Sequence, residues 1–155
     1  MGKKASDEIC RGNYDRLRAI FDAAIPDHQR FEMAYAFGVD VGTYTVLVVK
    51  TTTYRYTSYA VGFDATANDI VVLPVAQDMS GHGQPIYLKN SDIRSAKQSF
   101  INKEFTIKDD RLPKKYIQFV MSERLDDDPD NICILIEQTE HVQRFTQFFK
   151  NSFRR

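Results

Sequence analysis

Apolar residues near the start of the chain recur three or four positions apart, the spacing that places them on one face of an α-helix. The residues on this face are Ile9, Tyr14, Leu17, Ile20, Phe21 and Ala24. Ser6 is a favourable N-cap, and Asp7 and Glu8 place negative charge where the helix dipole is positive. Pro26 is unable to continue a helix. The pattern therefore predicts a helix that begins after Ser6 and ends before Pro26.

After this helix the pattern changes to the alternation of every second residue that is typical of a half-buried β-strand. Phe31, Met33, Tyr35 and Phe37 follow this alternation and predict the first strand. Two glycines within residues 38–42 predict a turn after it. Residues of high β-propensity, in alternating patterns or in continuous apolar runs, predict further strands at residues 44–50, 54–63, 70–75, 86–88, 104–108, 116–121 and 132–136.

The chain ends with an amphipathic pattern over residues 138–153. Its apolar positions are Val142, Phe145, Phe148, Phe149 and Phe153, so one face of the predicted helix is mostly aromatic. Phe148 and Phe149 are adjacent and point in different directions on an α-helix, so one ring is expected at the edge of this face. Strands followed by such a helix predict a mainly β (α+β) domain. We expect a bent β-barrel or sandwich capped by the C-terminal helix, with an added N-terminal helix.

Composition narrows the possible functions. The 155 residues suit one domain, and 21 basic against 21 acidic residues give a formal net charge of zero, which argues against nucleic-acid binding. Cys10 and Cys133 are too few for a secreted disulfide framework, so reduced, buried thiols are expected. The lysines at positions 3 and 4 lead into polar residues rather than an apolar run. We therefore expect a cytoplasmic protein, and prefer an unmodified terminus to myristoylation at Gly2.

The second half of the chain resembles the bacterial pleckstrin-homology and GRAM-like domains. The residues that carry the resemblance are Ile86-Tyr87-Leu88-Lys89, Ser91-Asp92-Ile93-Arg94-Ser95, Phe105-Thr106-Ile107-Lys108 and Tyr116-Ile117-Gln118-Phe119, followed by the last strand and helix. The resemblance implies an N-terminal helical extension over residues 1–28 and a pleckstrin-homology-like domain over residues 29–155, together one globular unit. The chain departs from the family in its N-terminal helix and in having phenylalanines where eukaryotic members often have a tryptophan.

The resemblance also implies binding rather than catalysis, because these domains serve mainly as lipid-headgroup or protein-docking modules. Members that bind phosphoinositides carry several Lys and Arg in the loop between the first two strands. We place that loop at residues 38–43, which contain one carboxylate and no cation. A phosphate needs charge-assisted donors, so this loop is poorly suited to a polyphosphorylated headgroup.

Other residue groups suggest chemistry only weakly. His28, His82 and His141 have no partners at metal-ligand spacing. Residues 126–131 and Glu137 partly match the spacing of an EF-hand, but they fall between predicted strands, and we interpret them as a solvated turn. The loop with Ser80 and His82 lacks the P-loop and nucleophile-elbow patterns. No metal, cofactor or catalytic residue is therefore predicted.

Two further groups are candidate contact residues. The basic residues Lys103, Lys108, Arg111, Lys114 and Lys115 surround a predicted hairpin turn, which is either simply solvated, as we prefer, or in weak contact with anionic lipid or an acidic partner. Tyr54, Tyr56 and Tyr59 lie in a strand with polar and aromatic residues on both faces. This strand is either an exposed edge that pairs with another chain or a covered central strand.

These observations lead to a non-catalytic cytoplasmic interaction module that binds a protein partner or self-associates. One alternative is peripheral binding to anionic lipid through the basic hairpin tip. The other is a small-molecule-binding or enzymatic barrel with a pocket near His82.

Overall fold

The computed structural model describes residues 5–46, 49–112, 114–128 and 133–153, and in the strands it leaves the side chains of residues 39–56 undescribed. The described elements are, in order, α1 (Asp7–Ala24), the short 3-10 helix η1 (His28–Arg30), β1 (Glu32–Val46), β2 (Val49–Asp64), β3 (Asp69–Val75), β4 (Ile86–Lys89), β5 (Ser95–Gln98), β6 (Phe105–Lys108), β7 (Tyr116–Phe119), β8 (Arg124–Leu125), β9 (Ile136–Glu137), α2 (Thr139–Phe148) and the π-helical turn η2 (Phe149–Phe153).

The strands form three antiparallel sheets. One has the order β1-β2-β3-β4, the second β5-β6-β7, and the third pairs β8 with β9. A single bridge between Phe37 and Val120 joins the outer edge of β1 to the residue that follows β7. The mainly β class with two helices is thus confirmed. No sheet closes on itself within the described part of the chain, so of the predicted barrel or sandwich the barrel is not confirmed.

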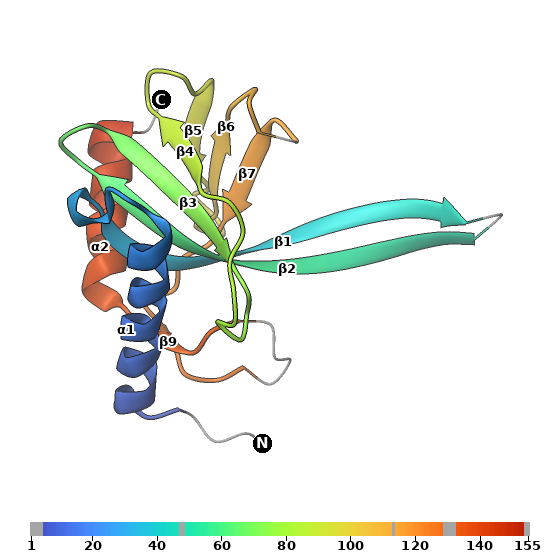
Figure 1. The fold of residues 1–155 in the computed structure, drawn as a ribbon. Coiled ribbons are helices and arrows are strands. Elements are labelled where there is room, and N and C mark those ends of the chain that lie inside the picture. The colour runs from blue at the N-terminus through green and yellow to red at the C-terminus, as the bar shows by residue number, and fades with distance from the viewer. Residues whose placement is uncertain (1–4, 47–48, 113, 129–132, 154–155) are drawn as a thin grey trace.

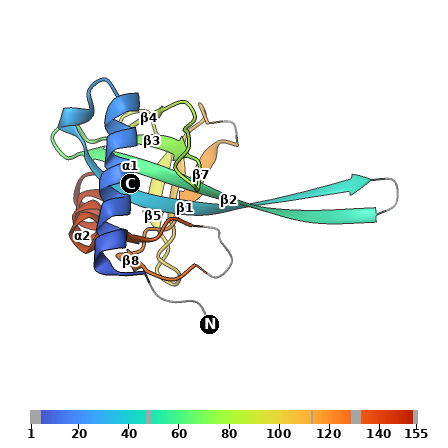
Figure 2. The ribbon, with the colours of Figure 1, turned by 60° about the horizontal axis from the view of Figure 1, so that its bottom comes forward.

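The four-stranded sheet has an apolar layer on each face, because successive residues of a strand point to opposite sides. Val71 and Leu73 of β3 pack with Leu17 and Phe21 of α1 on one face. The residues of the other face pack against the three-stranded sheet and the C-terminal helix. Figures 1 and 2 show α1 along one side of the sheet and α2 at its end.

The sequence signals at the two helices act as expected. The side-chain oxygen of Ser6 accepts a hydrogen bond from the backbone N–H of Ile9 at 3.3 Å, which caps α1. The helix ends at Ala24, two residues before Pro26. The C-terminal helix begins at Thr139 and buries the predicted aromatic face.

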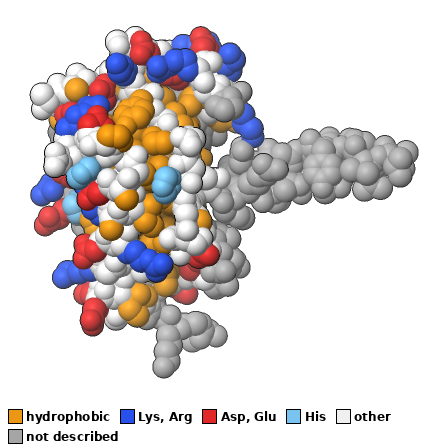
Figure 3. All heavy atoms as spheres, in the orientation of Figure 1, with side chains coloured by type: hydrophobic (Ala, Val, Ile, Leu, Met, Phe, Trp, Pro, Cys, Tyr) orange, Lys and Arg blue, Asp and Glu red, His pale blue; other side chains and the backbone are white. Residues whose placement is uncertain are grey.

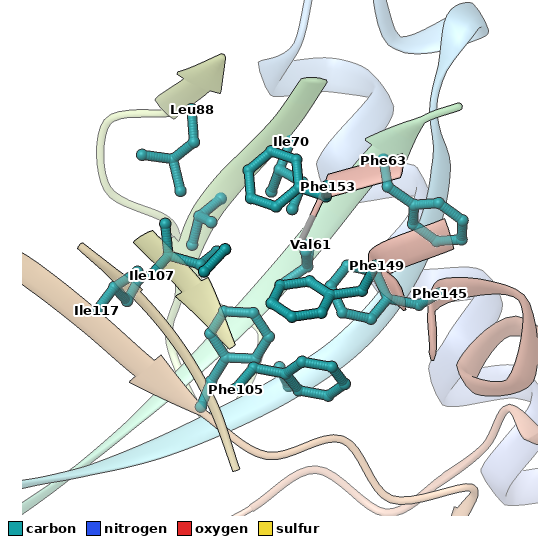
Figure 4. Close-up of a cluster of buried hydrophobic side chains, with 14 of the residues drawn as sticks. Val61, Phe63, Ile70, Leu88, Phe105, Ile107, Ile117, Phe145, Phe149 and Phe153 are labelled. Atoms are coloured by element: carbon teal, nitrogen blue, oxygen red, sulfur yellow. The ribbon is translucent and has the colours of Figure 1, made fainter. Parts of the chain in front are cut away.

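The prediction that one ring of the Phe148–Phe149 pair lies at the edge of this face is wrong, because both side chains are buried. The last turn, Phe149–Phe153, is a π-helical turn. A π turn is wider than an α turn, so it changes which residues share a face. Figure 4 shows Phe145, Phe149 and Phe153 in one cluster with Phe105, whose ring centroid lies 5.0 Å from that of Phe145 and 4.8 Å from that of Phe149.

Residues 38–42 form part of β1 and not the predicted turn, so β1 and β2 make one long hairpin. Gly38 serves a different purpose, since a Cβ at this position would lie 2.6 Å from the backbone carbonyl oxygen of Gln118. The absence of a side chain allows β1 to pass close to β7. The loop between the first two strands accordingly falls at residues 47–48, which lie outside the described residues.

The strand predicted at residues 132–136 is also shorter than expected. Among its described residues, 133–136, only Ile136 belongs to a strand, β9 (Ile136–Glu137). This strand pairs with Arg124–Leu125, which the sequence did not predict as a strand. Cys133 and Ile134 are nevertheless buried against the α1 face of the sheet. Their apolar character reflected burial rather than strand pairing. The strand β5 (Ser95–Gln98) was not predicted either.

Candidate interaction surfaces

Along the outer edge of β1, before Gly38, every second residue is hydrogen-bonded by a different group from the body of the protein, by which we mean the two larger sheets, the helices and the segments that pack on them. The carbonyl oxygen of Met33 accepts a hydrogen bond from the hydroxyl of Tyr14 at 2.7 Å. Two residues later, Tyr35 is bonded by the side chain of Gln138. After two more residues, the N–H and C=O of Phe37 bond to the backbone of Val120 at 3.0 and 2.9 Å. Alternate residues of this edge, Met33, Tyr35 and Phe37, therefore each have at least one backbone partner.

Gln138 takes the place of a neighbouring strand at Tyr35. Its Oε1 accepts a hydrogen bond from the Tyr35 N–H at 2.6 Å, and its Nε2 donates to the carbonyl oxygens of Tyr35 and Ser122, both at 2.9 Å. The residue is buried, with 2% of its surface exposed. A primary amide carries both a donor and an acceptor, so it reproduces the pairing that a peptide group would offer. Sequence reasoning missed this residue, because nothing in a helix N-terminal glutamine marks it as buried.

Beyond Gly38 the hairpin leaves the body of the protein as a two-stranded arm, which we define as residues 39–46 of β1 and 49–56 of β2. Figure 1 shows this arm projecting away from the remaining sheets. Each of its residues pairs across the hairpin, from Val39 with Tyr56 to Val46 with Val49. β3 pairs only with residues 58–64 of β2. Among the described pairings, the outer edges of both arm strands are therefore free.

An apolar cleft of about 260 Å³ lies at the root of the arm. It is lined by Gly38, Thr57, Tyr59, Pro74, Ile86, Leu112, Lys114, Tyr116, Ile117 and Gln118. These residues come from β1, β2, β3, β4, β7 and the turn before β7, so the cleft lies where the two larger sheets diverge. Ser80 and His82 do not line it. The residues offer an apolar wall with a few hydroxyl and amide groups, which suits an apolar side chain more than a charged ligand.

The three candidate tyrosines occupy two different environments. Tyr59 lies where β2 is central, paired with Ala36 of β1 and Pro74 of β3, and its ring packs edge-on to that of Phe119 with centroids 6.5 Å apart. Tyr54 and Tyr56 belong to the arm, and their side chains lie outside the described residues. Their backbone pairs with Val41 and Val39 of β1. The two alternatives of edge strand and central strand thus apply to different parts of the same strand.

The structure divides the five basic candidates between the two ends of β6. Lys103 precedes this strand, whereas Arg111, Lys114 and Lys115 follow it, and a four-residue strand spans roughly 13 Å. The guanidinium of Arg111 is held by Asp109 and lies 3.4 Å from Asp92, and Lys115 donates to the carbonyl oxygen of Asp110 at 3.2 Å. Figure 3 shows charges of both signs mixed over the visible face. These residues therefore do not form one basic patch.

A second hairpin tip, between β5 and β6, carries two exposed apolar side chains. Phe100 and Ile101 are each 92% exposed. The ammonium of Lys103 lies 5.8 Å from the centroid of the Phe100 ring. Sequence reasoning did not single out these residues, although a bulky apolar pair between Ser99 and Asn102, outside the predicted strands, is the signal that identifies them.

Asp126 and Glu137, two residues of the EF-hand-like pattern, form ion pairs with Arg124. Arg124 lies 3.0 Å from Asp126 and 3.2 Å from Glu137, so the first and last positions of the EF-hand-like pattern share one guanidinium. The carboxylate of Asp128 accepts a hydrogen bond from the backbone N–H of Cys133 at 3.1 Å. Residues 129–132 lie outside the described residues. Within the described part of the chain, no three His, Cys, Asp or Glu residues are grouped to hold a metal.

The three histidines lie on different elements and have separate partners. His28 lies 3.2 Å from Asp22, His82 bonds to the Gly83 carbonyl oxygen at 2.8 Å, and His141 lies 3.5 Å from Glu32. The ring of His141 also stacks on Tyr14 with centroids 4.4 Å apart.

Two buried tyrosine hydroxyls and the two cysteine thiols have raised pKa values, which favours their neutral forms. Burial raises the pKa of Tyr14, and the hydroxyl donates to a carbonyl oxygen. Burial raises the pKa of Tyr35 to about 12. Burial, with the nearby Asp128 carboxylate, raises the pKa of Cys133 to about 12, and burial also raises the pKa of Cys10. None of these four groups is poised to act as a nucleophile near neutral pH.

No helix in the described residues is both long and apolar enough to cross a bilayer. Comparison of the chain with family models, with characterised proteins and with solved structures finds no match in any of the three.

Proposed function

We propose that the protein is a non-catalytic interaction module that self-associates by adding a strand of a second copy to the outer edge of β1 in the arm. The observation that carries this proposal is the sequence of partners along that edge. Met33, Tyr35 and Phe37 each have a partner from the body, and the described pairings end there. Four further residues of β1 in the same alternation, at positions 39, 41, 43 and 45, present backbone groups on this edge.

The arm by itself is an incomplete structure in energetic terms, because an isolated two-stranded hairpin is only marginally stable in water. Its length strengthens this argument. Eight residues of β1 extend beyond Gly38, which corresponds to roughly 25 Å of strand. A third strand along the arm would provide the backbone partners and the apolar cover that the body provides closer to the root.

The charges in the arm favour the β1 edge over the β2 edge. Proteins protect free strand edges with lysines, prolines and other charged residues. The β2 part of the arm contains Lys50 and Arg55, whereas the β1 part contains Asp40 as its one charged residue. The β1 edge is therefore the less protected of the two.

The β1 edge can also pair with itself about a two-fold axis. In an antiparallel pair the residues whose backbone groups face the same edge must lie opposite one another. An axis through Gly42 meets this condition and places Val39 opposite Thr45 and Val41 opposite Thr43. Asp40 then lies opposite Tyr44, so no like charges meet. This complementarity favours a second copy as the occupant.

The sequence resemblance is a second, weaker support for this function. We propose on that resemblance that the described fold, a sheet of four strands, a sheet of three strands, a strand pair and a following helix, is a pleckstrin-homology-like domain. Domains of this type serve mainly in docking, which supports an interaction role. The position of the loop used for phosphoinositides in that family falls on residues 47–48, where the neighbouring residues supply one cation, Lys50.

Sedimentation equilibrium over a wide range of protein concentration tests the proposal. The informative variant is Val41→Pro, because proline removes an N–H that faces the outer edge and leaves the pairing with β2 in place. The matched control is Val41→Thr, which keeps the N–H and the strand propensity. We expect the wild type and the control to dimerise and the proline variant to remain monomeric.

A wild-type protein that stays monomeric at every concentration refutes self-association through this edge. Equal association by the proline variant, with an unchanged circular dichroism spectrum, would place the contact elsewhere and refute the role of the β1 edge. The spectrum also shows whether the variant has lost the arm itself, in which case Thr43→Pro, at the next position of the same edge, repeats the test.

A further inference from the structure

The hairpin tip between β5 and β6, residues 99–104, is an ordered loop rather than a loose one. The hydroxyl oxygen of Ser99 accepts hydrogen bonds from the N–H groups of Ile101 and Asn102, at 3.3 and 3.4 Å. The side chain of Asn102 accepts from the N–H of Glu104 at 3.1 Å. The N–H of Ser99 donates to the carbonyl oxygen of Glu104 at 2.7 Å, which closes the loop. The backbone is thus held in one shape.

This ordered loop holds its two largest apolar side chains in solvent. Phe100 and Ile101 are both 92% exposed, more than any other large apolar residue among those described. The next two are Ile9 at 54% and Tyr116 at 42%. A polar residue at either tip position would satisfy the same turn, so folding does not require these side chains. Their exposure therefore calls for a partner that covers them.

The cations around the tip indicate the charge of that partner. Lys97 and Lys103 are exposed on opposite sides of the β5–β6 hairpin, and the Lys103 ammonium lies 5.8 Å from the centroid of the Phe100 ring. Lys103 adopts a left-handed backbone conformation, with φ of 63°. This conformation disfavours a long side chain and is more readily adopted by glycine or asparagine. A lysine at this position supplies charge next to the apolar pair.

The shape of the tip favours a membrane over a protein as the partner. A protein interface of ordinary stability covers roughly 800 Å² on each side, whereas two large side chains supply about 300–400 Å². A bilayer surrounds a projecting tip on all sides, so it buries the whole of a small apolar group without a shaped partner surface. Lysines beside the inserted residues then meet the anionic headgroups.

We infer that the β5–β6 tip docks this protein on anionic membrane surfaces, with Phe100 and Ile101 inserted below the headgroups and Lys97 and Lys103 bound to lipid phosphates and carboxylates. This contact is separate from the β1 edge and does not rest on the self-association proposed above. Dimerisation would place two tips on one particle and strengthen the attachment.

The absence of tryptophan from the chain makes a direct test possible. In the variant Phe100→Trp the tip carries the one tryptophan, and in the control variant Ile9→Trp the reporter lies on α1. Emission is measured as vesicles of phosphatidylcholine, with and without phosphatidylserine, are added. Vesicles with brominated acyl chains then quench a tryptophan that enters the apolar layer.

We expect the emission of the tip reporter to shift to the blue and to be quenched by brominated lipid, with stronger binding when phosphatidylserine is present. The α1 reporter is expected to change little. In the otherwise wild-type chain, Phe100→Ser with Ile101→Ser should lower vesicle partitioning by about a hundredfold, at roughly a factor of ten for each side chain. Ile9→Ser is the matched control and should partition as the wild type does.

Three results would overturn the inference. The first is a tip reporter that keeps its solvent-exposed emission at high lipid concentration. The second is equal binding to vesicles with and without phosphatidylserine, which would remove the role of Lys97 and Lys103. The third is a blue shift that follows protein concentration without lipid, which would identify the tip as a contact between copies. Val41→Pro should leave vesicle binding by each protomer intact, so this test and that of the β1 edge fail independently.

Discussion

Replacing Gln138 with methionine removes an amide from the interior while nearly preserving the length and volume of the side chain. Three hydrogen bonds are lost: one from the N–H of Tyr35, and two to the carbonyl oxygens of Tyr35 and Ser122. Each such bond contributes about 1 kcal/mol, and a buried backbone group left without a partner costs about 1–3 kcal/mol. The apolar gain of methionine offsets part of this loss. We expect the free energy of unfolding to fall by about 3 kcal/mol.

For a chain of this length that loss lowers the melting temperature by roughly 6–12 °C. Urea and thermal unfolding followed by far-ultraviolet circular dichroism measure it. Gln143→Met is the matched control, because Gln143 lies exposed on α2, the helix that follows Gln138, and its replacement should change stability by less than about 0.5 kcal/mol. Gln138→Glu keeps the acceptor for the Tyr35 N–H but has no donor when ionised, so it should be less stable than Gln138→Met at neutral pH.

The reasoning is refuted if Gln138→Met unfolds within about 0.5 kcal/mol of the wild type. Such a result would mean that water or a shift of the chain pairs the β1 edge equally well at Tyr35. Of the three hydrogen-bonded residues of this edge, Met33, Tyr35 and Phe37, Tyr35 would then no longer support the proposed strand addition.

Three further predictions concern the core, the thiols and the pH dependence. Gly62→Ala should destabilise the protein by about 1–3 kcal/mol in urea unfolding, because the added Cβ would lie 2.5 Å from the ring of Phe21; wild-type stability would show that the helix moves aside freely. Cys10 and Cys133 should react with a thiol reagent far more slowly in the native protein than in denaturant, since both are buried and burial raises both pKa values; rapid native labelling would contradict this. A hydrogen bond from the Arg111 guanidinium lowers the pKa of Asp109, so the ionised carboxylate stabilises the fold fully above its unfolded pKa, and this stabilisation is lost as the pH falls through the lower folded pKa. Asp109→Asn should therefore be less stable than the wild type at neutral pH, and the difference in urea unfolding should shrink in acid. A difference that stays constant with pH would exclude the ionised carboxylate as its cause.

The parts of the fold that followed from the sequence are those determined by local chemistry. Ser6 and Pro26 defined α1 because capping and the loss of an N–H act within one turn of a helix. The continuous apolar run at residues 70–75 likewise predicted β3, whose two faces are both buried. These signals need no knowledge of distant residues.

The errors arose where a distant residue determined the local structure. Gly38 resembled a turn residue, but its lack of a Cβ serves the close approach of Gln118, eighty positions later. Phe148 and Phe149 were expected to diverge because an α-helix was assumed, and the π turn brings both into the core. Lys103 was grouped with Arg111 by sequence distance, although β6 places them at opposite ends of a strand. Pairwise spacing along a sequence does not contain such information.

The packing of α1 against the C-terminal part of the chain determines when this protein can finish folding. The side chain of Asn13 donates to the carbonyl oxygen of Leu135, 122 positions away, and the N–H of Ala5 bonds to Asp126 at 2.7 Å. During synthesis the helix leaves the ribosome more than a hundred residues before this part of its docking surface is made. Contacts of such long sequence separation slow folding, and part of α1 stays uncovered in the meantime. A nascent chain that has not yet reached Leu135 would therefore leave the first turns of α1, around Cys10 and Asn13, without this cover, although β3 can already pack against Leu17 and Phe21.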